Sequence, residues 1–354
     1  MRAREGKYEL LCIGNVMVDV FSRADPDWLD GQGITEGAQH VSAEQGARLL
    51  SRASGDPGFL IAPGGAAANV ARVAAMLGLR AAFAGCAGDD ENGALFKGGL
   101  EKDGVETFLK KGAGQTGLCL AFDAPGGARI AACPGAAQEF GEEDAPEALI
   151  AGADAVALDG YMLDRGALAR RVLTLASRSG IPVAVDAASV FQIRDKTEAI
   201  LQYSRGYPLI VFMNADESIV FYNTIRKGGA DDMTKSMSER EKESFILREI
   251  CPVLKLMTEG DIFPVIVIKM GSRGAVALAG GNVHRAGTFA VAPKNTVGAG
   301  DAFCAAFMSA WIRGRPIPKC AAFGNRVARE ALSVRGANLD GRRLARFRPF
   351  LRVQ

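Results

Sequence analysis

The stretch from residue 295 to residue 314 reads NTVGAGDAFCAAFMSAWIRG. A turn of small residues, Gly298, Ala299 and Gly300, leads to the carboxylate of Asp301 and then to a segment that is apolar almost all the way round. This pattern predicts a buried helix over 301–313. Because the first amides of a helix are unpaired donors with partial positive charge, its entrance can bind an anion. The alternative is a tight turn in which Asp301 caps the helix, and these residues alone leave both interpretations open.

The composition is that of a globular protein with a large core. The chain has 354 residues, of which 48% are hydrophobic and 23% charged, enough for one large α/β domain with appendages or for two ordinary domains. Lys and Arg number 42 against 40 Asp and Glu, a formal net charge of +2. This balance gives no support to nucleic-acid or membrane-surface binding as the main activity. We therefore expect neither kind of partner.

Three further features limit the cellular location and the available chemistry. No apolar run approaches the roughly 20 residues of a membrane span, and the N-terminal segment lacks the long apolar core of a signal peptide. The seven cysteines are scattered and form no CxxC pair, which indicates the reduced core residues of a cytoplasmic protein. Because His40 and His284 are the only histidines, the chemistry must use carboxylates, backbone amides, Lys or Arg, or a bound metal.

Apolar strands separated by helices recur along most of the chain. Besides the helix at 301–313, helices are expected over 165–179 and 318–333, and the long charged segment 223–260 is expected to be helical with a solvated face and a loop near KGGADDM. This alternation predicts an α/β fold with a central, mostly parallel sheet flanked by helices on both faces.

The domain organisation follows from where this alternation breaks. Two segments, about 16–45 and 106–133, do not fit it, and the second of them contains a hairpin-like pair of strands. No linker divides the chain and no internal repeat is present. We expect one main domain over residues 1–354, with these two segments forming a small accessory sheet.

Three other turns place small or polar residues after predicted strands or at predicted helix starts. PGGAAAN at 63–69 opens a helix, where Asn69 can bind a polar ligand or simply cap the helix. NADE at 214–217 can orient a hydrated Mg²⁺ through its waters, or form a capping box. KMGSRGA at 269–275 is a glycine-flanked turn suited to lie against a nucleotide. In an open parallel sheet, ligands bind at the carboxyl ends of the strands, where such turns gather.

Taken together, these motifs resemble those of the ribokinase-like (PfkB-type) carbohydrate and nucleoside kinase family. PGGAAANVARVAAMLG is similar to its N-terminal signature, and NTVGAGDAFCAAFMSAWIRG to its C-terminal one. NADE resembles its N-x-x-E motif, IGNVMVD its first-strand segment, and GCAGDDENG at 85–93 the pattern after its second strand. Any one motif is weak, but five motifs occur in the family's order over nearly the whole chain. The resemblance implies the ribokinase-like fold, in which the accessory segments form a β-sheet lid.

The resemblance also implies the reaction and its central residues. Asp301 would be the base that takes the proton from a primary hydroxyl of the substrate. The amides of Gly298, Ala299 and Gly300 would form the anion hole for the γ-phosphoryl group of ATP. Because phosphoryl transfer depends mostly on positioning and charge stabilisation, this small set of groups suffices.

The remaining roles concern the substrate and ATP. Residues expected to hold or border the substrate hydroxyls are Asn15, Asp19, Gly64, Gly65 and Asn69. Residues expected to contact ATP or its Mg²⁺ are Asn214, Glu217, Gly271, Gly274 and Asn325. Among these, Glu217 would hold Mg²⁺ through water, and Asn325 would lie near the adenine. A homodimer formed through the lid is a further expectation from the resemblance.

The chain departs from the family pattern at two positions. Asn295 stands where the second signature usually begins with Asp, which helps many members to coordinate a monovalent cation. We therefore expect weaker K⁺ activation than in a typical member. Ala67 stands where ribokinases carry Lys, which argues against ribokinase specificity, and the segments around 25–50 and 116–140 resemble the adenosine-kinase-like branch. Arg129, within the second segment, could close on substrate or remain a solvated lid residue.

The expected function is an ATP-dependent kinase that transfers the γ-phosphoryl group to a primary hydroxyl of a sugar or nucleoside. One alternative is a kinase for a sugar or sugar phosphate within the same family. Another is a non-catalytic, ligand-binding regulator on this fold. A regulator should have lost the base or the anion-hole glycines, whereas Asp301, Gly298 and Gly300 are all present.

Overall fold

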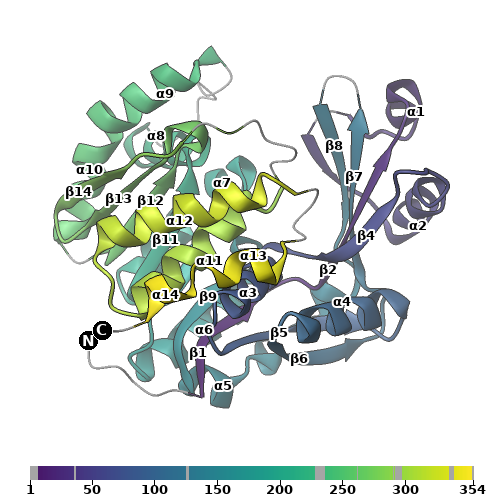
Figure 1. Cartoon of the computed structure of the whole chain (residues 1–354), viewed down its shortest axis with the longest axis horizontal. Coiled ribbons are helices and arrows are strands. Elements are labelled where there is room, and N and C mark those ends of the chain that lie inside the picture. Colours follow the sequence, from purple (N-terminus) through teal and green to yellow (C-terminus); the bar gives the residue numbers. More distant parts are fainter. Residues whose placement is uncertain are drawn as a thin grey trace.

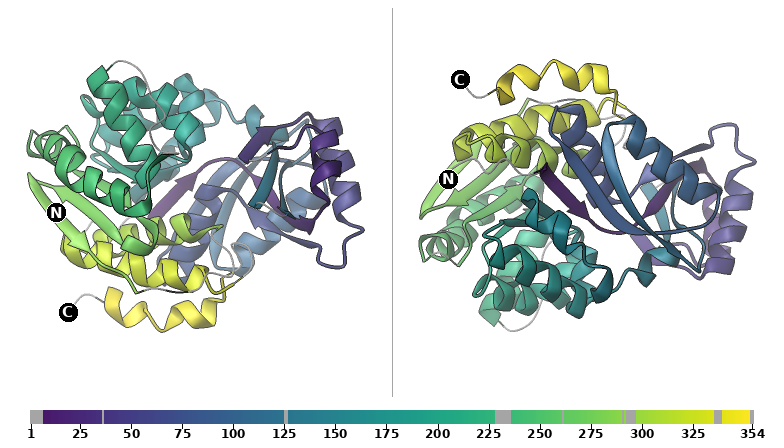
Figure 2. Two further views of the ribbon diagram at one scale, coloured as in Figure 1. Left: turned by 90° about the horizontal axis from the view of Figure 1, so that it is seen from above. Right: turned by 90° about the horizontal axis from the view of Figure 1, so that it is seen from below.

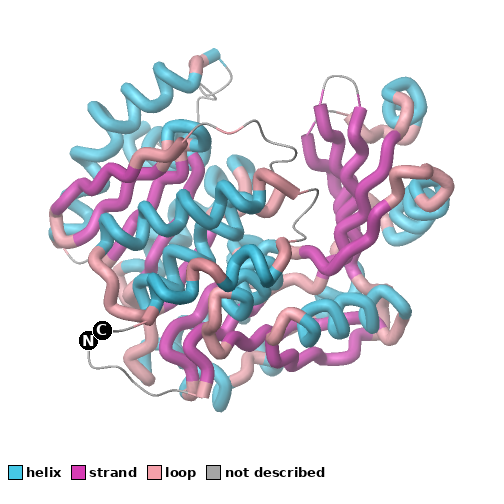
Figure 3. The backbone as a smooth tube through the Cα atoms, in the orientation of Figure 1, coloured by secondary structure: helices cyan, strands magenta, loops and turns pink. Residues whose placement is uncertain are grey.

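The larger of two sheets in the computed structural model has nine strands in the order β14-β13-β12-β11-β10-β9-β1-β5-β6 (Figures 1 and 3). The structure describes residues 7–35, 37–124, 127–227, 236–260, 262–289, 291, 297–334 and 339–352. All neighbouring pairs from β12 to β6 are parallel, and β13 and β14 continue the sheet as an antiparallel hairpin. The strands are β1 (Tyr8–Ile13), β5 (Ala81–Gly88), β6 (Val105–Gly112), β9 (Ala153–Leu158), β10 (Val183–Asp186), β11 (Leu209–Asn214), β12 (Val265–Lys269), β13 (Ala275–Ala279) and β14 (Asn282–Ala286).

Helices cover both faces of this sheet because its parallel strands are apolar on both sides. In β1, Leu10 and Cys12 face one layer of helices, whereas Leu11 and Ile13 face the other. The first layer contains α3 (Ala66–Met76), α4 (Glu91–Lys102), α11 (Ala299–Ile312), α12 (Ile317–Ala331), α13 (Gly341–Ala345) and α14 (Arg348–Leu351). The second contains α5 (Glu147–Ala151), α6 (Gly166–Arg178), α7 (Val190–Ser204), α8 (Ala215–Lys227), α9 (Glu239–Phe245) and α10 (Cys251–Glu259).

A five-stranded sheet stands at one side of the main sheet (Figures 1 and 2). Its order is β3-β8-β7-β2-β4, with bounds β2 (Met17–Arg23), β3 (Gly37–His40), β4 (Leu60–Gly64), β7 (Gly117–Ala124) and β8 (Gly127–Cys133). Two helices, α1 (Pro26–Gly31) and α2 (Ala43–Ala53), pack on the face where Val18, Val20 and Phe122 are buried. The chain enters this sheet directly from β1, through Gly14.

The predicted fold class is confirmed: a mostly parallel sheet is flanked by helices and accompanied by a second, small sheet. The strands of the second sheet differ in two places from the segments expected to form it. β4 joins it from outside those segments, and β6, which begins at Val105, pairs with β5 in the main sheet instead. Because β6 is a parallel edge strand of ordinary length, its polar pattern KK at residues 110 and 111 reflects an edge and not a separate sheet.

Helix positions agree with the expectations to within two residues at each end: 165–179 became α6, 301–313 became α11, and 318–333 became α12. The segment 223–260 contains the end of α8, then α9, a π-turn over Ile246–Ile250 and α10. Most of its expected loop, residues 228–235, lies outside the described residues. In the part of the chain that the structure describes, none of the helices is both long and apolar enough to cross a membrane.

The carboxyl ends of the parallel strands and the amino ends of α3 and α11 meet beside the second sheet. β10 ends at Asp186, β11 at Asn214 and β12 at Lys269, while Asp159 directly follows β9. This edge is where an open parallel sheet binds ligands.

Candidate active site

Two glycines bring the second sheet close to the start of α3. A methyl group at Gly64 would overlap the carboxylate of Asp19, which lies in β2 two residues beyond Met17, the partner of Gly64 in the register. Gly65 has a φ of 88°, and a methyl group there would approach the carbonyl oxygen of Asn15 to 2.6 Å. Glycine is therefore required at both positions. The expected substrate residues Asn15, Asp19, Gly64 and Gly65 are brought together.

Asn69 links this group to the start of α11. Its Nδ2 donates a hydrogen bond to Asp301 Oδ2 at 2.9 Å. Its Oδ1 is buried and has no hydrogen-bond partner among the described residues. Because a buried acceptor without a donor is costly, this oxygen is suited to receive a hydroxyl or N–H group of a ligand.

The start of α11 has the geometry of an anion site. Gly298 is its N-cap, in the left-handed conformation with a φ of 78°, and no side chain caps the helix. Among the described residues, the first amides of α11 therefore receive no side-chain cap, and they lie beside Asp301. The interpretation of Asp301 as a helix cap is wrong, because its carboxylate accepts from Asn69 across the site and not from the amides of its own helix.

Asp301 and Asp19 have similar electrostatic surroundings. Burial raises the pKa of Asp301 to about 7, although the hydrogen bond from Asn69 opposes the rise. Burial and the charge of Asp301 raise the pKa of Asp19 to about 7, against the opposing charge of Arg72. Each carboxyl group would therefore change its charge near neutral pH, where a general base is most effective.

Lys269 forms a buried network below the start of α11. Its Nζ donates to Asp186 Oδ2 at 2.6 Å, and the Cys304 thiol donates to the same oxygen at 2.9 Å. Burial would raise the pKa of Asp186, but the Lys269 ammonium group outweighs it and holds that pKa below its usual value. The ammonium group lies only 3.3 Å from the position of a methyl group at Gly300. A fixed positive charge is thus placed at the expected anion hole.

A cavity of about 20 Å³ lies next to this network, between α3, α11 and the ends of the sheet strands. Three carboxylates line it, those of Asp159, Asp186 and Asp301, together with apolar groups that include Ala67 and Phe212. It has room for about one water molecule. Ala67 is also close to Gly14, and this tight packing leaves no space for the Lys of ribokinases.

Asn214 and Glu217 form a reciprocal cap at the start of α8. The backbone N and Nδ2 of Asn214 donate to the two oxygens of Glu217 at 2.6 and 2.8 Å, and Asn214 Oδ1 accepts from the Glu217 amide at 2.9 Å. The capping-box interpretation therefore holds for these contacts. Burial and the nearby Asp186 raise the pKa of Glu217 to about 7. In the described part of the chain, no three His, Cys, Asp or Glu side chains are grouped so as to hold a metal ion directly.

The residues expected along ATP lie at the turn after β12 and on α12. Gly271 has a φ of 52° and open space around it. A methyl group at Gly274 would overlap the carbonyl oxygen of Ala286, and Asn325 Nδ2 donates to the same oxygen at 2.9 Å. Gly274 and Asn325 thus hold the end of β14 in place. The structure does not bring Asn325 to Asp301 or to the other substrate residues.

For two arginines, the structure differs from what the sequence indicated. Arg129 is neither solvated nor available to a ligand: its side chain is 12% exposed, and its Nη1 donates to Asp30 Oδ1 at 2.6 Å and to Ile34 O at 3.0 Å. Arg165 was missed, yet its Nη2 donates to Asn15 Oδ1 at 2.7 Å beside the buried Asp159. Arg165 thus reaches the expected substrate group, as does Arg72, whose charge acts on Asp19.

Sequence reasoning also missed Asp159, Asp186 and Lys269, and took Cys304 for packing alone. A shared signal was present, because each of the three charged residues ends or directly follows a strand of apolar residues. Asn295, on which the K⁺ expectation depends, lies outside the described residues.

The chain is similar in sequence to known proteins. Residues 56–342 match the pfkB family of carbohydrate kinases. The chain is 29% identical over 269 residues to an ATP-dependent ribose-1-phosphate kinase of Halopiger xanaduensis, covering 74% of this chain and 77% of that one. It is 24% identical over 347 residues to an adenosine kinase of Dictyostelium discoideum, covering 94% and 96%.

The fold is likewise similar to that of a crystallised relative. The structure of adenosine kinase from Sinorhizobium meliloti superposes with a TM-score of 0.80 and 25% identity, covering 96% of this chain and 98% of that one. This likeness extends over both sheets, and it indicates the adenosine-kinase-like branch of the ribokinase-like fold. The chain therefore belongs to the pfkB family of carbohydrate kinases and is a phosphotransferase that acts on a hydroxyl group of a sugar or nucleoside.

Proposed function

We propose that this enzyme transfers the γ-phosphoryl group of ATP to a primary hydroxyl of a nucleoside, with Asp301 as the base. The observation that carries the proposal is the hydrogen bond from Asn69 to Asp301 at the uncapped start of α11. It places a carboxylate with a pKa of about 7 beside the start of a helix that no side chain of the described residues caps. Such a base can take the hydroxyl proton while the amides stabilise charge on the transferring group.

Lys269 adds to the positive potential of this helix start. Its ammonium group is buried next to Gly300, and its ion pair with Asp186 holds it in place. A charge fixed in a buried site needs no reorganisation during the reaction. We assign Lys269 to positioning and charge stabilisation, because its ammonium group lies next to Gly300 of the proposed anion hole.

The carboxylates of Glu217 and Asp186 fit a magnesium ion that is held through water. Oxygen is the ligand atom that Mg²⁺ prefers, and Mg²⁺ usually keeps several of its waters. Both oxygens of Glu217 accept hydrogen bonds from Asn214, and the nearby charge of Asp186 contributes to the raised pKa of Glu217. A divalent cation nearby would offset this excess of negative charge. When bound with ATP, Mg²⁺ would neutralise charge on the phosphates.

We infer the substrate class from the face of the second sheet that is opposite to α1 and α2. Because side chains alternate along a strand, Met17, Asp19 and Phe21 share that face, opposite Val18 and Val20, and all five are buried. Their neighbours in register are small or apolar: Leu60, Ala62, Cys119, Ala121 and Ile130. Between Met17 and Phe21, Asp19 is the only charged side chain on this face. An apolar surface with one carboxylate suits a base joined to a ribose whose hydroxyls bind Asp19.

A second candidate, a phosphorylated sugar, is favoured by Arg165. Its guanidinium group reaches Asn15 within the expected substrate site, and guanidinium is well matched to phosphate. The similarity to the ribose-1-phosphate kinase of Halopiger xanaduensis points the same way. Against it, Arg165 already donates to the Asn15 side chain and to the Phe140 carbonyl, so a phosphate would have to displace those contacts.

The test is ADP release from Mg-ATP with adenosine, other nucleosides, ribose, fructose and ribose 1-phosphate, in wild type and in Arg165→Gln. A nucleoside kinase should turn over adenosine with a micromolar KM and keep most of that activity in the variant. Turnover of ribose 1-phosphate alone, abolished in Arg165→Gln, would favour the second candidate. A protein that binds ATP but turns over nothing would support a regulator.

Three finer expectations belong to this proposal. The second sheet would act as a lid that excludes water from the reaction, and a homodimer through it is tested by the molecular mass in solution. The described structure shows all seven cysteines unpaired, which supports a reducing, cytoplasmic location. We also infer that K⁺ activates turnover only weakly, since Asn295 lacks a charge and Lys269 already supplies one. Strong, saturable K⁺ dependence would contradict this.

A further inference from the structure

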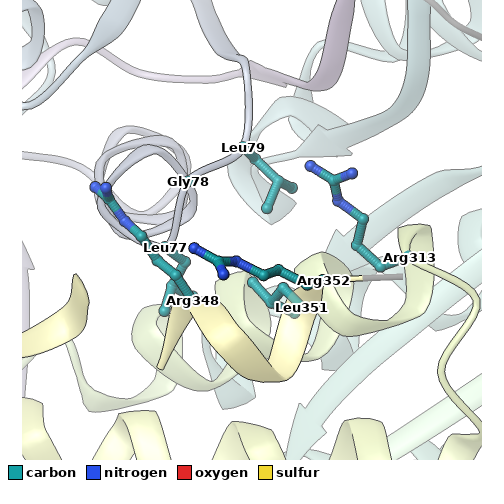
Figure 4. Close-up of a pocket in the computed structure, with 7 residues that line it drawn as sticks. All are labelled: Leu77, Gly78, Leu79, Arg313, Arg348, Leu351 and Arg352. Carbon is teal, nitrogen blue, oxygen red and sulfur yellow. The ribbon is translucent and has the colours of Figure 1, made fainter. Parts of the chain in front are cut away.

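A second pocket lies at the opposite edge of the main sheet, where α3 and α11 end (Figure 4). Its volume is about 260 Å³. Three arginines and three leucines line it together with Gly78: Arg313, Arg348, Arg352, Leu77, Leu79 and Leu351. None of the residues expected in the active site takes part. The pocket is therefore a separate feature of the fold.

The arginines carry more positive charge than their surroundings compensate. Arg313 Nη2 pairs with Glu9 Oε1 at 2.7 Å, but its Nε is buried without a hydrogen-bond partner among the described residues. Arg348 Nε donates to the carbonyl oxygen of Met76 at 3.1 Å. For the described part of the chain, neither Arg348 nor Arg352 has a carboxylate partner. Two guanidinium groups without a carboxylate partner among the described residues match the double charge of a phosphate monoester.

The remaining lining indicates an organic ligand. Leu79 lies between the guanidinium groups of Arg313 and Arg352, and Leu77 and Leu351 form the apolar side of the same space (Figure 4). The side chain of Arg348 runs along Gly78, within 3.5 Å of the position of a methyl group there. A pocket in which leucine side chains lie among guanidinium groups suits a small molecule with one phosphate and an apolar body.

The pocket is connected to the catalytic edge by two helices that pack against each other. α3 begins next to Asn69 and ends at Met76, whose carbonyl binds Arg348. α11 begins next to Asp301 and ends one residue before Arg313. With a rise of about 1.5 Å per residue, the pocket lies about 20 Å from the catalytic ends. The hydrogen bond between Asn69 and Asp301 thus joins the far ends of the same two helices.

We propose that this arginine pocket binds a small organic phosphate and that its occupancy changes catalysis through the relative position of α3 and α11. The ligand would draw together Arg348, tied to the end of α3, and Arg313, at the end of α11. A shift of either helix changes the distance between Asn69 and Asp301. By linkage, substrates in the active site would alter the affinity of the arginine pocket to the same degree.

The binding test uses phenyl phosphate, a phosphate monoester with an apolar body, with phenol and inorganic phosphate as comparisons. Calorimetric titrations are run with a non-hydrolysable ATP analogue and Mg²⁺ at saturation, so that phosphate does not enter the anion hole. Wild type should bind phenyl phosphate more tightly than inorganic phosphate, and phenol not at all. Arg348→Gln/Arg352→Gln should bind it at least about tenfold more weakly, since charge-assisted hydrogen bonds are lost.

Two matched variants exclude trivial causes. Arg342→Gln/Arg346→Gln removes the same charge from the neighbouring segment but not from the pocket, and should bind like wild type. Arg348→Lys/Arg352→Lys keeps the charge and should recover part of the affinity. Equal affinity in wild type and in the Gln variant, or equal loss in the Arg342/Arg346 control, would overturn the site.

The coupling is tested separately, by steady-state kinetics. Phenyl phosphate should change kcat, or the KM for the hydroxyl substrate, in a manner that ATP cannot compete away, and this effect should vanish in Arg348→Gln/Arg352→Gln. Binding without any such effect would overturn the coupling. Because calorimetry needs no turnover, failure of the nucleoside assignment leaves the binding result unaffected.

Discussion

Asn69 Nδ2 donates to Asp301 Oδ2 over 2.9 Å, although 232 positions of the chain separate the two residues. The contact joins the starts of α3 and α11, the two helices whose N-terminal turns carry the family signatures. It orients the proposed base, and together with the charge of Lys269 it opposes the rise in the pKa of Asp301 that burial causes. The proposed chemistry therefore depends on how two helices pack, and each of the predictions below perturbs that arrangement or the charges around it.

Replacing Asp301 by Asn should remove the base while keeping the shape of the site. We expect turnover to fall by roughly 10²–10⁴, with ATP affinity nearly unchanged, because the anion-hole amides remain. Steady-state kinetics and a titration with ATP measure the two quantities. Turnover close to that of wild type would exclude Asp301 as the base.

Asn69→Ala should shift the pH dependence of the reaction. The Asn69 hydrogen bond lowers the pKa of Asp301, so its loss should raise that pKa, and the acidic limb of the kcat/KM profile should move to higher pH. Asn223→Ala on α8 is the control, since Asn223 is also buried but lies on the other face of the sheet. A profile that stays in place, or that moves equally in the control, would contradict the proposed role.

Asp19→Asn should stabilise the protein at alkaline pH and impair substrate binding. The folded pKa of Asp19 is raised from 3.8 to about 7, so protonation favours the fold, and this contribution is lost as pH rises through 7. At pH 5 the folded state still keeps the proton whereas the unfolded chain has largely lost it, so only part of the contribution is gone and Asn should raise stability less than at pH 8. At pH 8 the variant should unfold at a higher temperature than wild type.

Thermal unfolding at both pH values, alongside the KM of the hydroxyl substrate, measures this trade-off. An unchanged difference between the two pH values would show that Asp19 is not the titrating group. An unchanged KM would remove it from the substrate site.

Lys269→Met should be strongly destabilising, and a second substitution should repair stability without repairing catalysis. Removing the ammonium group leaves Asp186 as an unpaired buried charge, which costs roughly 3–5 kcal/mol. In Lys269→Met/Asp186→Asn that charge is gone, and the free energy of unfolding should recover in large part. Turnover should stay low in both, because the positive charge beside Gly300 is absent.

Denaturant unfolding and steady-state kinetics of both single variants and the double variant complete the cycle. If the double variant recovers turnover together with stability, Lys269 supports the fold alone. If neither single variant loses stability, the buried ion pair does not have the assigned weight.

Local sequence patterns determined the secondary structure and the anion-binding turn of this protein. The apolar strands separated by helices predicted the parallel sheet because a strand buried on both faces must be apolar throughout, as in Leu10 to Ile13. GAGD before an apolar run predicted the start of α11, since the need for glycine and for unpaired amides is local. The pair Asn214 and Glu217 could likewise be predicted, because the two residues of a capping box are only three positions apart.

Only the tertiary structure decided which charged residues meet. Lys269 and Asp186 are 83 positions apart, and Arg165 and Asn15 are 150 apart, so no spacing in the sequence relates them. The sequence left Arg129 either as a residue that closes on substrate or as a solvated lid residue, whereas in the structure it binds Asp30 of α1 and the carbonyl oxygen of Ile34. The arginine pocket had no local signature, because it forms where two helices and the C-terminal segment end together. Charges over such separations interact through the packing of elements, which the order of residues alone does not specify.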